Sequence, residues 1–260
     1  ALICWHYTHD KKVTLSGLFH DVATPVFKHS IDFMNGDYVN QESTEKKTKE
    51  IIKNDEKVMK LLERDNILVD EIYDYKIYPI ADNDTPRLSS DRFEYSLSNM
   101  YFTYGLVDFN TIKLIYQSVT SNFTNEDGII ELGFEDLEQA RKFVEITSKL
   151  SIIYREDRTI YSMQLLADII KRLNEQDEIT IDDLYNMKES EVIELIKNSE
   201  YGNIFNIWAL SQHVCLSDTR PENTYSVNHP SKVRYIDPLV STSNKYGRIS
   251  KLDDLSKYYI

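Results

Sequence analysis

The residues with the clearest chemical potential are an adjacent histidine and aspartate, His20 and Asp21, which follow an apolar stretch from Val13 to Phe19. An imidazole nitrogen and a carboxylate oxygen together suit a borderline or hard divalent metal ion. Neighbouring residues on a helix point about 100° apart, so both side chains reach one ion only just beyond the helix end. Two adjacent ligands cannot close a metal site, and a lone His-Asp pair also suits a simple helix cap.

A second histidine and aspartate, His29 and Asp32, are three residues apart and would share one face of a helix. Asp32 could then orient or charge-stabilise His29, which would act as a general acid or activate a water molecule. A core or capping role for His29 is the alternative. Before this pair, Pro25 either breaks or opens a helix, and Thr24 is a suitable N-cap.

The composition predicts a mainly helical fold to position these residues. The 260 residues include only 7 glycines, which strand-rich folds need at their turns, and 28 Tyr and Phe residues to bury. Apolar residues at helical spacing occur in 89–104, 134–153, 159–174 and 189–198. A small hairpin is expected around Gly128, and the segment after residue 215 has the character of a loop-and-strand tail.

Charge and motifs exclude several classes of protein. Asp and Glu total 43 and Lys and Arg total 30, so the net charge of -13 argues against general nucleic-acid binding. Neither GxxxxGK[ST] nor GxGxxG occurs, which disfavours P-loop and dinucleotide enzymes. Two cysteines exclude a disulfide framework. With no apolar run of about 18 residues, we expect no membrane association and a cytoplasmic location.

The surroundings of both pairs resemble a known signature. The segment Leu18-Phe19-His20-Asp21-Val22, followed by Pro25-Val26-Phe27-Lys28-His29, is similar to L-x-H-D-(I/L/V)-G-H-x-P-F-S-H of the HD-domain metal-dependent phosphohydrolases. It resembles most the deoxynucleoside triphosphate triphosphohydrolase-like branch. Asp91-Arg92-Phe93-Glu94-Tyr95 resembles the second motif of that family, D-(R/K)-x-D-Y, and lies 70 residues after Asp21. The two motifs occur in the family's order.

The resemblance implies a metal set of His20, Asp21 and Asp91, completed by a histidine from an earlier helix. His6 and His9 are too near His20 to occupy that place easily, although either could substitute. The apolar start at Ala1 reads as a helix already under way, so we expect the remaining ligand upstream of it. The cofactor would be one divalent ion: Mn, Fe, Ni, Co or Mg.

The resemblance also places Tyr95 near a nucleotide sugar, one helical turn after Asp91. The candidate phosphate-binding side chains are Lys28, Lys46, Lys47 and Arg92, although exposed lysines usually only solvate a surface. Packing is the alternative for Tyr95, and an N-cap is the alternative for Asp91. The sequence departs from the family pattern where Thr24 and Thr44 replace histidines. Threonine cannot shuttle a proton near neutral pH, so these changes bear on triphosphohydrolase chemistry in particular.

The sequence therefore predicts an HD-type helical bundle with added helices, a hairpin and an irregular tail. We expect an HD-type core at 1–115, a helical extension at 116–215 and the tail at 216–260. The expected function is metal-dependent hydrolysis of a nucleotide or related phosphate ester by a metal-activated water. The expected partners are that substrate and, from the resemblance, further copies in a homo-oligomer. The alternative is a catalytically divergent nucleotide-binding or scaffold protein on the same fold.

Overall fold

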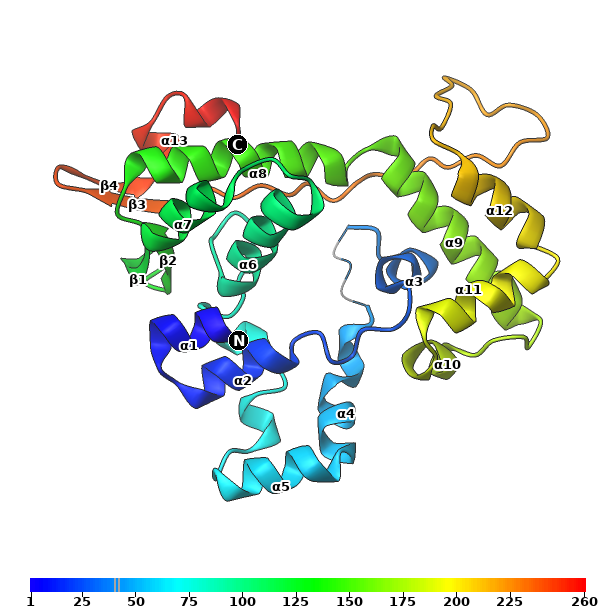
Figure 1. Ribbon diagram of the computed structural model, residues 1–260, viewed down its shortest axis with the longest axis horizontal. Helices are drawn as coiled ribbons and strands as arrows, with labels where there is room; N and C mark the ends of the chain where they lie inside the picture. Colours follow the sequence, from blue (N-terminus) through cyan, green and yellow to red (C-terminus); the bar gives the residue numbers. More distant parts are fainter. Residues whose placement is uncertain (40, 42) are drawn as a thin grey trace. The chain divides into compact units, whose positions relative to one another are not determined.

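The computed structural model describes residues 1–39, 41 and 43–260 (Figure 1). The described chain is mainly helical and contains one small four-stranded sheet, as the glycine-poor sequence predicts. Its contacts divide it into two compact units, which we describe separately. The first unit comprises Ala1–Val22, Thr48–Ile153 and Arg234–Ile260, and the second comprises Ala23–Lys47 and Tyr154–Val233. Neither unit is one continuous stretch of chain.

These units have other bounds than the three consecutive segments expected from the sequence. Residues 234–260 of the expected tail belong with the N-terminal segments, and residues 154–215 of the expected extension belong with 23–47. The reason is strand pairing across a long sequence separation. Strand β3 (Leu239–Thr242) pairs in parallel with β2 (Ile130–Phe134), with Gly133 opposite Leu239.

The helices of the first unit are short, apart from α8, whose final residue falls in the second unit. They are α1 (Leu2–Thr8), α2 (Lys11–Phe19), α4 (Thr48–Asn54), α5 (Glu56–Arg64), α6 (Ser90–Ser98), α7 (Phe109–Gln117), α8 (Leu137–Tyr154) and α13 (Ile249–Leu252). A π-helical turn, Asn99–Thr103, continues α6. Phe93 of α6, Phe134 of β2 and Phe143 of α8 are fully buried and contact one another through their rings.

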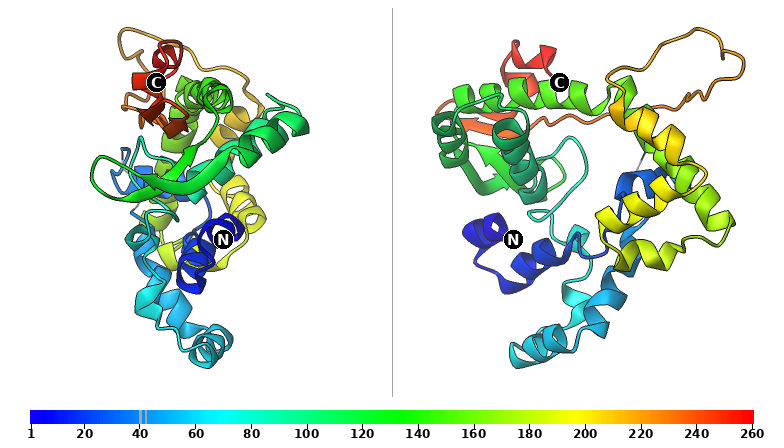
Figure 2. Two further views of the ribbon diagram at one scale, coloured as in Figure 1. Left: turned by 90° about the vertical axis from the view of Figure 1, so that its left-hand side faces the viewer. Right: turned by 45° about the vertical axis from the view of Figure 1, so that its right-hand side comes forward.

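The sheet has the order β1-β2-β3-β4. Strands β1 (Val119–Thr124) and β2 form the expected antiparallel hairpin, and Gly128 in its turn has a φ of +79°. Strand β4 (Lys245–Arg248) pairs antiparallel with β3. The segment that leads into β3 runs beside α8 in Figures 1 and 2, where Ser151 Oγ donates to the Arg234 carbonyl.

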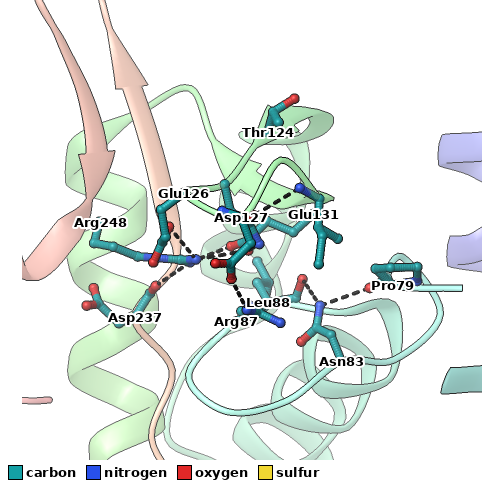
Figure 3. A network of polar contacts seen from close by, with 12 residues as sticks. Pro79, Asn83, Arg87, Leu88, Thr124, Glu126, Asp127, Glu131, Asp237 and Arg248 are labelled. Carbon is teal, nitrogen blue, oxygen red and sulfur yellow. Dashed lines mark hydrogen bonds and ion pairs between the residues drawn. The ribbon is translucent and has the colours of Figure 1, made fainter. Parts of the chain in front are cut away.

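A buried ion network joins the hairpin to the last strands (Figure 3). Arg248 donates to Glu131 Oε1 at 2.5 Å and to Glu131 Oε2 at 3.0 Å, and Glu131 is fully buried. Glu126 accepts a further bond from Arg248 at 3.1 Å. The Asp237 carbonyl accepts another at 3.1 Å. Because a buried charge is costly unless it is paired, this network fixes the non-local pairing of the sheet.

The second unit is a set of packed helices around an aliphatic core. Its helices are α3 (Lys28–Met34), α9 (Asp157–Glu175), α10 (Ile181–Asn186), α11 (Glu189–Asn198) and α12 (Gly202–Leu210). Helix α3 packs against α9, and α9, α11 and α12 lie side by side in Figure 1 and in the right-hand view of Figure 2. Ile170, Leu173, Val192 and Ile196 are fully buried in this core.

The segment before α3 settles the alternatives for Pro25. Helix α3 begins only at Lys28, because Phe27 has a φ of +57°, which a right-handed helix does not accommodate. Pro25 therefore precedes the helix instead of opening it, and Thr24 is not its N-cap. At the start of α10, Thr180 is the N-cap, since its Oγ1 accepts from Asp183 N at 3.1 Å. Every helix in residues 1–39, 41 and 43–260 is too short or too polar to cross a bilayer.

Candidate metal centre

His20 lies at the C-terminal end of α2, in the first unit. Asp10 begins this helix by accepting from the Lys12 and Val13 backbone amides at 2.7 and 3.3 Å. At the other end, His20 Nδ1 is 3.0 Å from the Gly17 carbonyl oxygen. A carbonyl can only accept, so Nδ1 carries a proton and donates. This bond leaves Nε2 as the atom that the ring presents to its surroundings.

Asp91 lies in the first turn of α6. Ser89 caps this helix, because its Oγ accepts from Arg92 N at 3.2 Å and donates to Asp82 at 2.9 Å. The alternative role of Asp91 as N-cap is thus filled by Ser89. The backbone amide of Asp91 also donates to the Ala81 carbonyl at 3.1 Å, which ties the helix start to the preceding loop. The Asp91 side chain remains available for other contacts.

The structure brings His20, Asp21 and Asp91 together, although their positions span 70 residues of sequence. His20 Nε2 is 3.0 Å from Asp21 Oδ2 and 3.1 Å from Asp91 Oδ1. Burial lowers the pKa of His20, but the hydrogen bonds and charges of the two carboxylates outweigh it and raise the pKa to about 10. Without a metal ion, the ring is therefore an imidazolium at pH 7 and neutralises one of two carboxylates.

The same atoms suit a divalent ion in place of that proton. Metal–ligand bonds of about 2.1 Å place neighbouring ligands of an octahedral ion about 3.0 Å apart, which matches both separations from Nε2. The bond from Nδ1 to Gly17 is also the support that orients a metal-bound histidine. Within residues 1–39, 41 and 43–260, no group of three or more His, Cys, Asp or Glu side chains is arranged so that it could hold a metal ion as it stands. The match to a divalent ion thus rests on two contacts, that of His20 with Asp21 and that of His20 with Asp91.

A pocket of about 310 Å³ adjoins the cluster, and residues of the first unit line it. His20 and Asp91 line it together with Ala1, Leu2, Ile3, Cys4, Gly17, Tyr75, Ala81, Ser90 and Glu94. The Tyr75 ring meets the His20 ring edge-on, with centroids 5.6 Å apart. His6 and His9 do not line this pocket, and their rings instead contact those of Tyr116 and Trp5.

Glu94 is a site residue that our sequence reasoning did not single out. It is exposed, lies three residues after Asp91 on α6 and lines the same pocket. Its Oε1 accepts from Ser98 Oγ at 2.5 Å, which leaves the second carboxylate oxygen for another contact. The signal was available in the i, i+3 spacing within Asp91-Arg92-Phe93-Glu94. That spacing places both carboxylates on one face of a helix.

His29 and Asp32 lie in the second unit, on α3, and meet as their spacing predicts. His29 Nδ1 is 3.7 Å from Asp32 Oδ2, and His29 is about half exposed. Asp32 is fully buried, and its Oδ1 accepts from Ser43 N at 3.1 Å and from Ser43 Oγ at 2.7 Å. Asp32 therefore holds the turn after α3 as well as facing His29. A catalytic role for this pair stays a prediction.

The candidate phosphate-binding residues fall in both units. Lys47 pairs with Asp182 at 2.5 Å and lies over the Tyr185 ring at 4.3 Å. Burial raises the pKa of Tyr185, and the charges of Lys47 and Lys28 lower it, so Lys28 is also close to this ring. Lys46 is exposed. These three lysines belong to the second unit.

Arg92 and Tyr95 belong to α6 in the first unit. The Arg92 guanidinium donates to Asn83 Oδ1 at 2.7 Å and to the Arg87 carbonyl at 2.9 Å, so it has a structural role in the loop before α6. Burial raises the pKa of Tyr95, while the charges of Arg234 and Arg92 lower it. Packing thus accounts for much of the Tyr95 side chain, and contacts with a ligand remain predictions for both residues.

The two threonines at expected histidine positions have different surroundings. Thr24 is exposed. Thr44 is buried, and its Oγ1 has no hydrogen-bond partner in the described part of the chain.

Comparison of this chain with models of known protein families, with curated proteins and with solved structures finds no match.

Proposed function

We propose that this protein is a metal-dependent phosphohydrolase that acts on nucleotides or related phosphate esters, in the manner of the HD-domain family that its motifs resemble. The observation that carries the proposal is the contact of His20 Nε2 with both Asp21 and Asp91. The end of α2 and the start of α6 are far apart in sequence, and they meet at residues that belong to the two motifs. A helix cap alone requires no partner on a second helix.

His20, Asp21 and Asp91 would hold the ion. When bound, a divalent ion lowers the pKa of a water molecule and polarises a phosphoryl oxygen. The hydrogen bond from His20 Nδ1 to Gly17 fixes the tautomer that offers Nε2 as a ligand. Glu94, on the pocket wall, is placed to accept a proton or to orient a polar group of the substrate. Tyr95 would contact the sugar of a nucleotide.

Hydrolysis of a defined panel tests this proposal. The protein is incubated with deoxynucleoside triphosphates, nucleoside triphosphates and nucleoside monophosphates, with Mn²⁺, Mg²⁺, Ni²⁺ or Co²⁺, and products are separated by chromatography. We expect metal-dependent turnover that the double variant His20→Ala/Asp21→Ala lacks. Release of triphosphate would assign triphosphohydrolase chemistry, whereas release of phosphate would assign hydrolysis of an anhydride bond in a triphosphate or of the ester bond in a monophosphate.

The chain contains its own matched control. His9 and Asp10 form a second His-Asp dipeptide in the same unit, at the start of α2. The variant His9→Asn/Asp10→Ser keeps a residue type that accepts the positive φ of position 9 and keeps an N-cap at position 10. It should retain full turnover. No turnover by the folded parent protein with any metal would contradict the hydrolase.

A catalytically divergent nucleotide-binding or scaffold protein is the second candidate. The replacement of two family histidines by Thr24 and Thr44 favours it, because threonine cannot transfer protons near neutral pH. This candidate predicts that nucleotides bind without being hydrolysed. Calorimetry with a deoxynucleoside triphosphate, on protein that shows no turnover, distinguishes it from a protein with no nucleotide site.

A further inference from the structure

The second unit contains a larger cavity than the one beside His20. Its volume is about 840 Å³, within the range of small-molecule sites. It lies among the start of α9, the helix α12 and the segment 211–231 that follows α12. All of its lining residues belong to the second unit, so its shape depends on that unit alone.

Three arginines line this cavity. Arg155, Arg158 and Arg220 form no ion pair with a described carboxylate, in a chain with 43 acidic residues. Arg155 Nε donates to Ser231 Oγ at 3.1 Å, and the Arg158 guanidinium makes a long contact of 3.5 Å to the Gln212 carbonyl. Asp157 and Asp218 also line the cavity, so the three arginines leave it with a positive balance. A planar guanidinium with unused donors suits carboxylate or phosphate.

Aromatic side chains form another part of the wall, and hydrogen bonds hold them in place. Trp208 Nε1 donates to Ser162 Oγ at 2.9 Å. Tyr225 OH donates to Asp168 Oδ2 at 2.7 Å, and its ring meets that of Tyr161 edge-on at 5.5 Å. Fixed aromatic rings offer flat apolar surfaces at little entropic cost to a planar ligand.

From these two features we propose that the cavity binds a small ligand that joins a planar ring to an anionic group. The arginines bind the anion, and Trp208, Tyr161 and Tyr225 contact the ring. A nucleoside phosphate and an aromatic carboxylate share this chemistry. The proposal concerns a site separate from His20, Asp21 and Asp91, so it does not rest on the proposed hydrolase activity.

Tryptophan fluorescence tests the proposal directly. The chain has two tryptophans, so the variant Trp5→Phe leaves Trp208 as the only one. This protein is titrated in EDTA with AMP and with benzoate, and with adenosine and inorganic phosphate as ring-only and anion-only probes. We expect AMP or benzoate to change Trp208 fluorescence saturably, with an affinity at least tenfold higher than that of either partial probe. Whichever of AMP and benzoate binds more tightly shows whether the anionic group is a phosphate or a carboxylate.

Substitutions on α9 provide the matched pair. Arg158→Gln, at the cavity, should weaken binding at least tenfold, whereas Arg172→Gln, on the same helix but outside the cavity, should change it less than twofold. The helical signal in the circular dichroism spectrum verifies that both variants fold. The proposal is overturned if no probe binds, if adenosine or phosphate binds as tightly as the complete ligand, or if both variants bind equally. Since EDTA removes divalent ions, these outcomes are independent of the metal centre.

Discussion

At the scale of single residues, His20 is the centre of the candidate site. Its two nitrogens have different roles, because Nδ1 donates to Gly17 while Nε2 faces two carboxylates. A residue that only caps a helix would need the first contact and not the second. The sequence alone could locate His20, Asp21 and Asp91, since their types and order match a motif. It could not show that α6 returns to the end of α2, which depends on packing far along the chain.

The His29–Asp32 pair gives a prediction that separates catalysis from stability. His29→Gln should leave the free energy of unfolding nearly unchanged, because the side chain is about half exposed. If His29 transfers a proton in the reaction, turnover should fall about 10²–10⁴-fold. Asp32→Ala should instead lower the free energy of unfolding by about 1–3 kcal/mol, because the Ser43 donors lose their buried acceptor. Urea unfolding and turnover assays measure both. Unchanged turnover in folded His29→Gln would remove this residue from the mechanism.

At the scale of elements, the sheet shows what the sequence could and could not predict. The hairpin of β1 and β2 is local, and Gly128 predicts its turn, where the structure gives this glycine a positive φ. The parallel pairing of β2 with β3 joins residues about a hundred positions apart, and no local pattern encodes it. Gly133 permits this pairing, since a Cβ there would lie 2.7 Å from the Leu239 carbonyl oxygen.

The buried pair of Arg248 and Glu131 should be a main support of that sheet. Arg248→Met leaves the buried Glu131 without its ion-pair partner, although Asn125 Nδ2 still donates to Glu131 Oε2 at 3.0 Å, so the free energy of unfolding should fall by about 3–5 kcal/mol. The matched substitution Lys149→Met breaks an exposed pair with Glu145 on α8 and should cost no more than about 0.5 kcal/mol. Urea denaturation of both variants makes the comparison. Equal losses would contradict the structural role assigned to Arg248.

A second ion pair predicts a pH dependence. Arg141 of α8 donates two bonds to Asp253, at 2.8 and 2.7 Å, and this pairing lowers the pKa of Asp253 to about 2. The folded pKa lies below the usual value near 3.8, so the pair stabilises the fold above that value and its contribution disappears as the pH falls to about 2. The thermal stability of Asp253→Asn should therefore be below that of the parent at pH 6, and the gap should close on acidification. A gap that stays constant from pH 6 to pH 2 would contradict this assignment.

At the scale of the whole molecule, each compact unit is assembled from separate stretches of chain. The sequence predicts helices at 159–174 and 189–198, which the structure has as α9 and α11, because apolar spacing is a local signal. It could not predict the units, because membership depends on which distant segments pack together. The cavity of the second unit was missed for the same reason. Arg158 and Arg220 are 62 residues apart, and an irregular segment brings them to one cavity.

Direct measurement of metal binding tests the central claim, that His20, Asp21 and Asp91 hold a divalent ion. Calorimetric titration of the metal-free protein with Mn²⁺ should show one binding site. Asp91→Asn should weaken binding at least tenfold, because it removes the charge of one ligand. The same substitution at Asp84, an exposed residue of the loop before α6, should leave the affinity within twofold. No Mn²⁺ binding by the parent protein, or equal affinity in all three proteins, would contradict the account.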